Sequence, residues 1–510
     1  MEYNLLKHSS AYCDKFLDTV NEQIVDADIT LPDYCPDIEK ILKCTLIPKI
    51  YTRNICGGQL SVDGIAVVRI LYCDGVKHNV RSFEHSCPFA ATFNLKSTPQ
   101  QYIVHSFAKC EYINCRALSP RKLSVHAAFS LYAKVLSKDS CDFYGFDDDC
   151  DLQTKQQQIS VSDLCAMCQE QFSFVQDISV GANVPVQTML AYDTAVRITQ
   201  LKSIHSKLML SAVLELKIMY LSDLDSRNIE HLTSQFEINR VFDCDSVSDE
   251  CTNIPQLEIM SSDVSVKNDA LSDGTELSLD VKLCFSNISY CQKDLSIIDD
   301  VYSTEYKTES KRSMLSCESN HSLKTFANVV QTTVDFDSTK ITQMLDVYCE
   351  NVTASVIISD EKMTLQGKTN ACMLFADEQG AANYIERSVD FEFLLDADRS
   401  FDKVELYDAV VKSISFRLVS DNKIELRLEI VSDLILCDSM SLNPIVAVER
   451  LDDSKIEKDD CSLVMYFADK GEDVWDIAKM YNTRKSLLIS ENSLDTDKLE
   501  ENRMLLVVTE

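Results

Sequence analysis

A pattern of 13 residues that occurs three times constrains the fold of this chain more than any other feature of its sequence. The copies are VDGIAVVRILYCD (Val62–Asp74), LSAVLELKIMYLS (Leu210–Ser222) and LQGKTNACMLFAD (Leu365–Asp377). The third position is small and the eleventh aromatic in every copy: Gly64, Ala212 and Gly367, then Tyr72, Tyr220 and Phe375. The copies start about 150 residues apart, which is the length of a domain and not of a solenoid repeat. The sequence therefore predicts three tandem domains of one kind.

The repeated segments also have the periodicity of β-strands. In the second copy, apolar residues occupy every second position from Leu208 to Tyr220. This period of two predicts a long strand with one buried face. A lead-in with turn residues, such as Gly57 and Gly58, precedes each copy and predicts a hairpin. About 60 residues after each copy a second alternating strand recurs: Leu123–Val135, Leu277–Ile288 and Ile424–Ile435.

The C-terminal segment follows a different order of patterns. An apolar strand, Leu463–Phe467, comes first, and Asp473 can then cap a helix with apolar residues at helical spacing. Thr483 can cap a second helix, and Met504–Val508 supplies a closing strand. These patterns predict a small βααβ module.

The predicted fold class is thus mainly β, with three tandem antiparallel β domains and one small α+β module. Gln-rich, helix-favouring residues from Leu152 to Gln176, after the acidic run Asp147–Asp149, predict a linker that leads into a helix. Charge-dense residues after Pro444 predict a second linker. The expected units are an N-terminal extension (1–30), a first repeat (31–145), a linker and helix (146–179), a second repeat (180–335), a third repeat (336–437), a charged linker (438–462) and the C-terminal module (463–510).

The charge balance limits the expected partners. The chain has 49 Lys and Arg against 81 Asp and Glu, a formal net charge of −32. Because this charge repels phosphate backbones and anionic lipids, we expect no nucleic-acid partner. The acidic residues either keep the protein soluble or dock a basic partner, and the sequence leaves both open. No signal-peptide pattern and no run of about 18 apolar residues is present, so we expect a cytoplasmic protein without a transmembrane segment.

No constellation of residues points to catalysis. The sequence has no phosphate-binding G-x-x-x-x-G-K-[ST] motif and no H-E-x-x-H zinc motif, and its 8 histidines are scattered. We therefore expect no enzyme, no catalytic residues and no cofactor.

The cysteines favour free thiols. There are 21, an odd number spread from Cys13 to Cys461, in a chain without a signal-peptide pattern. Cys165 and Cys168 form the only C-x-x-C pair, and no second pair or neighbouring histidine completes a tetrahedral zinc site. We expect these two residues to be core cysteines and the chain to have no metal site.

The C-terminal segment closely resembles the LysM domain. The resemblance rests on GEDVWDIAKMYNT from Gly471, then Asn492-x-Leu494, then L-x-x-N-x-M-L-L-V from Leu499. It implies a shallow groove for N-acetylglucosamine polymers between the loop after the first strand and the loop after the second helix. The residues that it places in this groove are Gly471, Glu472, Asp473, Val474, Asn492 and Leu494.

Several features leave the ligand of this module open. Asp473 stands where the LysM family usually has Thr, and Asn502 where it usually has Gly. Trp475 is either a platform for a sugar ring or a core residue of the first helix. The 6 basic and 10 acidic residues from Leu463 to Glu510 give the module a net charge of −4, so a protein partner suits it at least as well as an anionic wall polymer.

The segment LPDYCPDIEKILKC, Leu31–Cys44, followed by the strand at Val62, resembles the start of a SPOCS domain, a family named for spore coat and cell surface proteins. SPOCS repeats ahead of a LysM module are similar to spore coat assembly proteins. This resemblance implies a scaffold of the mother-cell cytosol, recruited to the forespore surface or spore coat by a SpoIVA-type morphogenetic ATPase or another coat protein. The alternative is a protein that binds peptidoglycan or cortex through N-acetylglucosamine polymers, which requires a route out of the cytosol.

Overall fold

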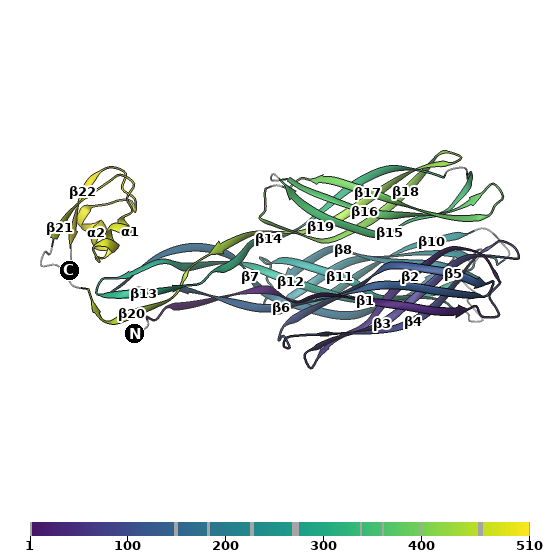
Figure 1. Cartoon of the computed structure of the whole chain (residues 1–510), viewed down its shortest axis with the longest axis horizontal. Helices are drawn as coiled ribbons and strands as arrows, with labels where there is room; N and C mark the ends of the chain where they lie inside the picture. The colour runs from purple at the N-terminus through teal and green to yellow at the C-terminus, as the bar shows by residue number, and fades with distance from the viewer. Residues whose placement is uncertain are drawn as a thin grey trace.

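The structure is a computed structural model that describes residues 3–146, 151–180, 184–224, 229–267, 275–336, 339–359, 362–397, 399–456 and 463–508. Its fold is mainly β, as predicted: three β-sandwiches precede a small α+β module (Figure 1). Each sandwich consists of two three-stranded antiparallel sheets. The first, fifth and sixth strands of a sandwich form one sheet, and the second, third and fourth strands form the other.

The first sandwich packs the sheet β1-β6-β5 against the sheet β2-β3-β4. Its strands are β1 (Leu6–Thr30), β2 (Ile38–Cys56), β3 (Gln59–Asp74), β4 (Val80–Asn94), β5 (Tyr102–Ser119) and β6 (Lys122–Gly145). Phe89 of β4 and Phe129 of β6 meet edge to face across the core, with ring centroids 4.9 Å apart. The apolar face of each sheet is thereby removed from water.

The other two sandwiches repeat this arrangement. The second contains β7 (Leu152–Ser179), β8 (Thr188–Ile204), β9 (Lys207–Leu221), β10 (Glu230–Asp243), β11 (Thr252–Val266) and β12 (Glu276–Ser303). The third contains β14 (Leu315–Asp335), β15 (Ile341–Ser359), β16 (Lys362–Asp377), β17 (Ala382–Leu395), β18 (Lys403–Ser420) and β19 (Lys423–Leu442). Two further strands, β13 (Tyr306–Arg312) and β20 (Ile445–Lys455), pair with each other.

The strands predicted from the repeated patterns are confirmed. The three 13-residue copies lie in or overlap β3, β9 and β16, and the later alternating segments lie in β6, β12 and β19. Each of these is the middle strand of its sheet. The first predicted hairpin turn is also present, since Gly57 and Gly58 have φ angles of 58° and 76°. The turn expected at Asp360 and Glu361 lies outside the described residues.

The helix expected within residues 146–179 is wrong. From Leu152 to Ser179 the chain forms β7, which pairs with β12 along its whole length. The helix-favouring Gln and Glu side chains are mostly exposed or half-buried, whereas Ile159, Val161 and Leu164 are buried. Tertiary pairing therefore overrides local helix propensity here. The acidic run Asp147–Asp149 lies outside the described residues.

Two other expected boundaries also differ from the structure. Residues 6–30, expected to be an extension, form β1 and pair with β6 in the first sandwich. The second sandwich ends at Ser303, so β14 belongs to the third, and β13 pairs with β20 outside both. Within the expected linker 438–462, residues 445–455 form β20, and 457–462 lie outside the described residues.

The longest strands continue beyond their sandwiches and form what we call the stalk: the outer ends of β1, β6, β7, β12, β14 and β19, with β13 and β20 (Figure 1). The stalk has a core of its own. Phe143 of β6, Ile159 of β7, Leu295 of β12 and Cys317 of β14 are buried in one cluster. Strands from all three sandwiches thus contribute to a single element that leads towards the C-terminal module.

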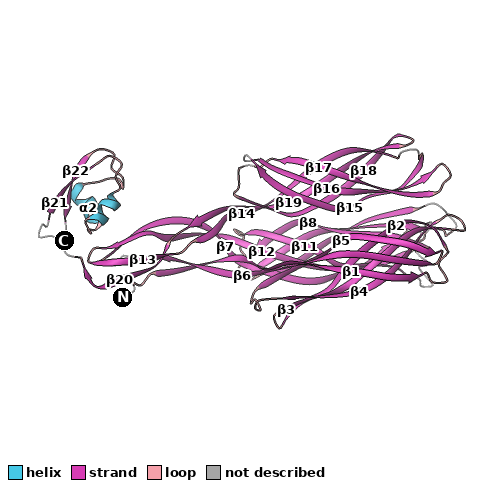
Figure 2. Ribbon diagram, in the orientation of Figure 1, coloured by secondary structure: helices cyan, strands magenta, loops and turns pink. Residues whose placement is uncertain are grey.

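The only helices among the described residues are the two short ones of that module (Figure 2). Neither is long and apolar enough to cross a membrane.

Candidate functional site

The C-terminal module has the predicted order of elements: β21 (Leu463–Ala468), α1 (Val474–Met480), α2 (Lys485–Asn492) and β22 (Arg503–Val508). β21 and β22 pair antiparallel. Ile477 of α1, Leu488 of α2 and Leu505 of β22 are buried together, so the helices cover one face of this two-stranded sheet.

Hydrogen bonds fix the loop between β21 and α1. The Gly471 N–H donates to the Leu499 carbonyl at 2.8 Å, and the Leu499 N–H donates to the Glu472 carbonyl at 3.0 Å. Gly471 has a φ of 94°, a backbone conformation that residues with a side chain rarely adopt. Asp473 caps α1, because its carboxylate accepts the Trp475 N–H at 2.9 Å. The first loop of the predicted groove is therefore held mostly by its own backbone.

Two of the six predicted groove residues, Val474 and Asn492, have buried side chains. Val474 is fully buried in the core of the module. Asn492 is also buried: its Nδ2 donates to the carbonyls of Leu488 (2.9 Å) and Leu506 (2.7 Å). Its Oδ1 accepts the Leu506 N–H at 2.6 Å. The Asn492 side chain thus connects the end of α2 to β22, which leaves it little capacity for a ligand.

The remaining predicted residues differ in their accessibility. Gly471 is exposed, whereas Glu472 and Leu494 are half-buried. The Tyr466 hydroxyl donates to Glu472 Oε1 at 3.2 Å, and Glu472 Oε2 is buried without a hydrogen-bond partner. Asp473 bonds to Lys155 of the stalk, with its Oδ2 at 2.8 Å from the lysine Nζ. The structure brings these residues into one region but turns few of their polar atoms towards solvent.

The first helix of the module lies against the tip of the stalk. Tyr302 of β12 packs into the core of the module and donates its hydroxyl to the Thr483 carbonyl at 2.7 Å. Among the hydrogen bonds that Asp300 accepts are those from the Trp475 indole N–H at 2.9 Å and from Lys479 Nζ at 2.7 Å. The stalk and the module are therefore joined by both apolar and charged contacts.

The contacts between the stalk and the module also lower the pKa values of two carboxyl groups, those of Asp300 and Asp473. Burial disfavours the charged form of Asp300, but the hydrogen bonds from Lys479 and the Trp475 indole outweigh it and lower its pKa. For Asp473, burial is likewise outweighed by the hydrogen bonds from Lys155 and the Trp475 N–H, so its pKa is also lowered. Both groups are anionic at neutral pH and support the docked position of the module.

Trp475 has a structural role in this arrangement. Its side chain is buried and contacts the Tyr302 ring edge to face, with centroids 4.9 Å apart. The sequence left two roles open for Trp475, a platform for a sugar ring or a core residue, and the structure supports the core residue. The stalk contributes the other ring of this contact, Tyr302. An open platform for a sugar ring is not formed by this residue.

The most accessible surface of the module is instead the outer face of its sheet. Leu463, Met465 and Phe467 of β21 and Met504 of β22 have 53%, 71%, 67% and 61% of their surface exposed. Met465 pairs with Leu506, and Phe467 pairs with Met504, so these side chains lie side by side on one face. We call Leu463, Met465, Phe467 and Met504 the apolar face.

The resemblance to LysM did not point to this face, but the sequence contained a signal for it. In LVMYF every residue is apolar, although only one side of the strand is needed for the core. The helices cover only one side of this two-stranded sheet. The side chains of Leu463, Met465 and Phe467 point to the other side and therefore remain exposed to solvent.

A second ordered region lies in the first sandwich, in the segment between β1 and β2. Arg121 donates to the Cys35 carbonyl (3.0 Å), the Asp37 carboxylate (2.8 Å) and the Pro32 carbonyl (2.7 Å). Tyr72, the aromatic residue of the first copy, donates its hydroxyl to the Pro36 carbonyl at 3.3 Å. This distinctive segment therefore serves to close the end of the first sandwich.

Comparison with known proteins identifies that sandwich. No curated protein and no solved structure matches the chain. A family model described as "SipL, SPOCS domain" matches residues 37–118, from the start of β2 to the end of β5. The match includes the first copy of the repeated pattern, Val62–Asp74. Residues 37–118, in the first β-sandwich, are therefore similar to a SPOCS domain.

Proposed function

We propose that the chain is a non-enzymatic scaffold of bacterial spore coat assembly, which acts in the mother cell and docks on a coat morphogenetic protein through its LysM-like module. A SpoIVA-type ATPase is the expected partner. The match to a SPOCS domain supports a role in sporulation. The observation that carries the docking role is the apolar face, four large side chains exposed on the outer side of the sheet.

The orientation of the module favours this role. Its α1 side is attached to the stalk through Tyr302 and Asp300, so the two-stranded sheet is the side left for a partner. Exposed apolar patches on soluble domains mark interaction sites, and Met and Phe are enriched in the centres of protein interfaces.

A protein partner fits the apolar face better than a glycan does. Glycans present many hydroxyl groups and need convergent hydrogen-bond donors and acceptors, which Leu463, Met465, Phe467 and Met504 lack. The net charge of −4 over residues 463–510 further favours a partner with basic residues around an apolar centre.

The three sandwiches suit a scaffold because they are joined to one another by buried or half-buried ion pairs. Arg53 of β2 bonds to Glu258 of β11 at 2.9 Å, which links the first and second sandwiches. Lys43 of β2 bonds to Glu386 of β17 at 2.8 Å, which links the first and third. The sandwiches can then present several sheet surfaces at fixed relative positions, while the module binds the partner that localises the protein.

The test uses the full chain and two binding reactions. Met465→Asp with Phe467→Asp places two charges on the apolar face, and we expect binding to the coat ATPase of the same organism to weaken at least tenfold. The matched control is Val241→Asp with Leu394→Asp, which alters residues that are 56% and 65% exposed on the second and third sandwiches. Equal affinity of the two double variants would contradict the docking role of the module.

The second reaction measures binding of chitooligosaccharides to the same proteins. Sugar binding that survives the Met465→Asp and Phe467→Asp changes, together with no binding to the ATPase, would favour the peptidoglycan- or cortex-binding alternative. Micromolar binding to the ATPase without a sugar response would support the scaffold.

A further inference from the structure

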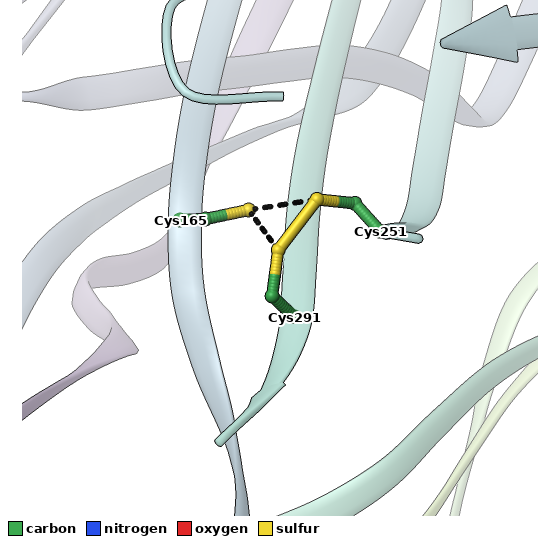
Figure 3. Close-up of side chains that lie close together, drawn as sticks. All are labelled: Cys165, Cys251 and Cys291. Atoms are coloured by element: carbon green, nitrogen blue, oxygen red, sulfur yellow. Dashed lines mark hydrogen bonds between the residues drawn. A yellow bond between two sulfur atoms is a disulfide. The ribbon is translucent and has the colours of Figure 1, made fainter. Parts of the chain in front are cut away.

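Three cysteines that are far apart in sequence lie together in the second sandwich (Figure 3). Cys165 comes from β7, Cys291 from β12, and Cys251 directly precedes β11. Cys251 and Cys291 form a disulfide, and the Cys165 Sγ lies 3.0 Å from the Cys291 Sγ and 3.4 Å from the Cys251 Sγ. The expectation of free thiols therefore fails for one pair, while the other cysteines of the described ranges are free.

Sheet geometry explains how the three side chains meet. In the order β11-β12-β7, the strand of Cys291 is central and its two neighbours bring the other cysteines. Cys165 is the extra residue of a β-bulge: Ser289 pairs with Ala166 and Tyr290 with Leu164, so Cys165 has no partner in the ladder. Bulges re-aim side chains and occur next to functional sites. Here the bulge directs the third sulfur towards the other two.

The cluster is adjacent to an open pocket of about 340 Å³. Cys291 lines this pocket, and so do Glu250, Tyr290 and His321. The His321 side chain is only 4% exposed; its Nε2 lies 3.1 Å from a Glu318 carboxylate oxygen, and its Nδ1 is buried without a hydrogen-bond partner. A buried acceptor without a partner in the wall of a pocket indicates space for a polar ligand or water.

We propose that Cys165, Cys251 and Cys291, once the disulfide is reduced, bind one soft divalent cation of the zinc class. A low-molecular-weight thiol supplies the reduction: two of its molecules become one disulfide, and Cys251 and Cys291 take up two electrons and two protons. The three thiols then lose their protons as the cation binds. Three thiolates with a fourth position open to solvent form the ligand set of an accessible zinc site.

The distances allow this site with small movements. At a Zn–S bond of about 2.3 Å, tetrahedral geometry separates the sulfur atoms by roughly 3.8 Å. Cys165 must therefore move away from the other two sulfurs by less than about 1 Å, given the present 3.0 and 3.4 Å. Cys251 lies outside the ladder, in the loop before β11, where the backbone can accommodate the change. The pocket beside Cys291 gives the cation a path from solvent.

The third thiol also explains why the cluster need not stay oxidised. A thiol in contact with both sulfurs of a disulfide permits exchange among the three, so the bond is open to reduction. Cys168, three residues from Cys165, lies in a different cluster, where it packs with Cys244 in the core, and both thiols are free. Cys168 therefore provides a control at almost the same place in the sequence.

The experiment uses the full chain, reduced by a phosphine and kept under anaerobic conditions, with Zn²⁺ as the probe. We expect one zinc ion per chain by elemental analysis and three sulfur ligands by X-ray absorption spectroscopy. Cys165→Ser and Cys291→Ser should each lose the stoichiometric zinc, while Cys168→Ser should keep it. Thermal unfolding in the absence of metal shows whether the variants remain folded.

Two results would overturn the proposal. One is a reduced wild-type chain that binds no zinc, which would make the cluster an exchangeable disulfide only. The other is bound zinc with fewer than three sulfur ligands, or zinc that Cys165→Ser retains. Because X-ray absorption is measured on the wild-type chain, the proposal can fail even if every variant unfolds.

Discussion

Tyr302, at the end of β12, packs its ring edge to face against Trp475 of the C-terminal module, with the two ring centroids 4.9 Å apart. Trp475 is the only tryptophan in the chain. Its emission therefore reports directly on the contact between the stalk and the module, without any label.

Replacing Tyr302 with alanine should detach the module from the stalk. The change removes the ring contact and the hydrogen bond to the Thr483 carbonyl, and aromatic pairs contribute about 0.5–1.5 kcal/mol beyond their burial. We expect the emission of Trp475 to shift to longer wavelength as water reaches the indole. Tyr302→Phe should shift it little, because it keeps the ring. Identical spectra for Tyr302→Ala and the wild type would show that the stalk does not shield the indole.

Acid should weaken the same contact through Asp300. Burial opposes its charged form, but the bonds from Lys479 and the indole lower its pKa below the usual 3.8. The stabilisation is therefore complete at pH values above about 4 and is lost as the pH falls through the lowered pKa. Asp300→Asn should cost about 1–2 kcal/mol at pH 7 in a urea titration followed by Trp475 emission.

The comparison at low pH separates this group from the many other carboxylates. As the pH falls through the lowered pKa of Asp300, the difference between the wild type and Asp300→Asn should shrink towards zero, because the carboxyl group then becomes neutral as well. A difference that stays the same throughout the acid titration would mean that the charge of Asp300 has no part in docking.

The sequence predicts the middle strands of the sheets and misses several edge strands. β3, β9 and β16 have one continuous apolar face, so their alternation is visible without a partner. β1 and β7 pair with strands far along the chain, Leu6 with Gly145 and Leu152 with Ser303, and they carry many polar residues. Local patterns hold no information on such distant pairing, and the Gln-rich start of β7 imitates a helix.

The candidate sites show the same limit. The order of elements in the C-terminal module could be predicted, because its core positions lie within 50 residues of one another. The contact between Trp475 and Tyr302 could not be predicted, since the two residues are 173 positions apart in the sequence. The cluster of Cys165, Cys251 and Cys291 could not be predicted either. A C-x-x-C motif is recognised from its local spacing, whereas these three sulfur atoms come together only when β7, β12 and the start of β11 pair in one sheet.

Removing Glu258 should destabilise the interface between the first and second sandwiches strongly. The Arg53 side chain is only 2% exposed and bonds to Glu258 at 2.9 Å. Without the carboxylate its charge stays buried and uncompensated, which typically costs about 3–5 kcal/mol. Glu258→Gln should therefore lower the free energy of unfolding by an amount in this range. The pair of changes Arg53→Met and Glu258→Met should cost less than Glu258→Gln alone, and a greater loss in the double variant would contradict the argument.

The last prediction concerns the small position of the repeated pattern. A Cβ on Gly64 would lie 2.1 Å from the Lys49 carbonyl oxygen and 2.7 Å from Phe89 Cζ, and on Gly367 it would lie 2.3 Å from the Thr353 carbonyl oxygen. Both glycines thus allow a neighbouring strand to approach closely. The second copy has Ala212, which pairs with Ile238 instead of a phenylalanine.

Gly64→Ala should consequently destabilise the first sandwich by about 1–3 kcal/mol or more, measured by chemical denaturation. Adding Phe89→Ile should recover only part of the loss, because the contact with the Lys49 carbonyl remains. Ala212→Gly is the matched control and should cost about 0.5–1 kcal/mol through backbone entropy and about 0.8 kcal/mol through the loss of its buried methyl group. If Gly64→Ala were as mild as this control, the glycine would not be required by the close approach of β2, and its match with Gly367 would have to arise from something other than packing.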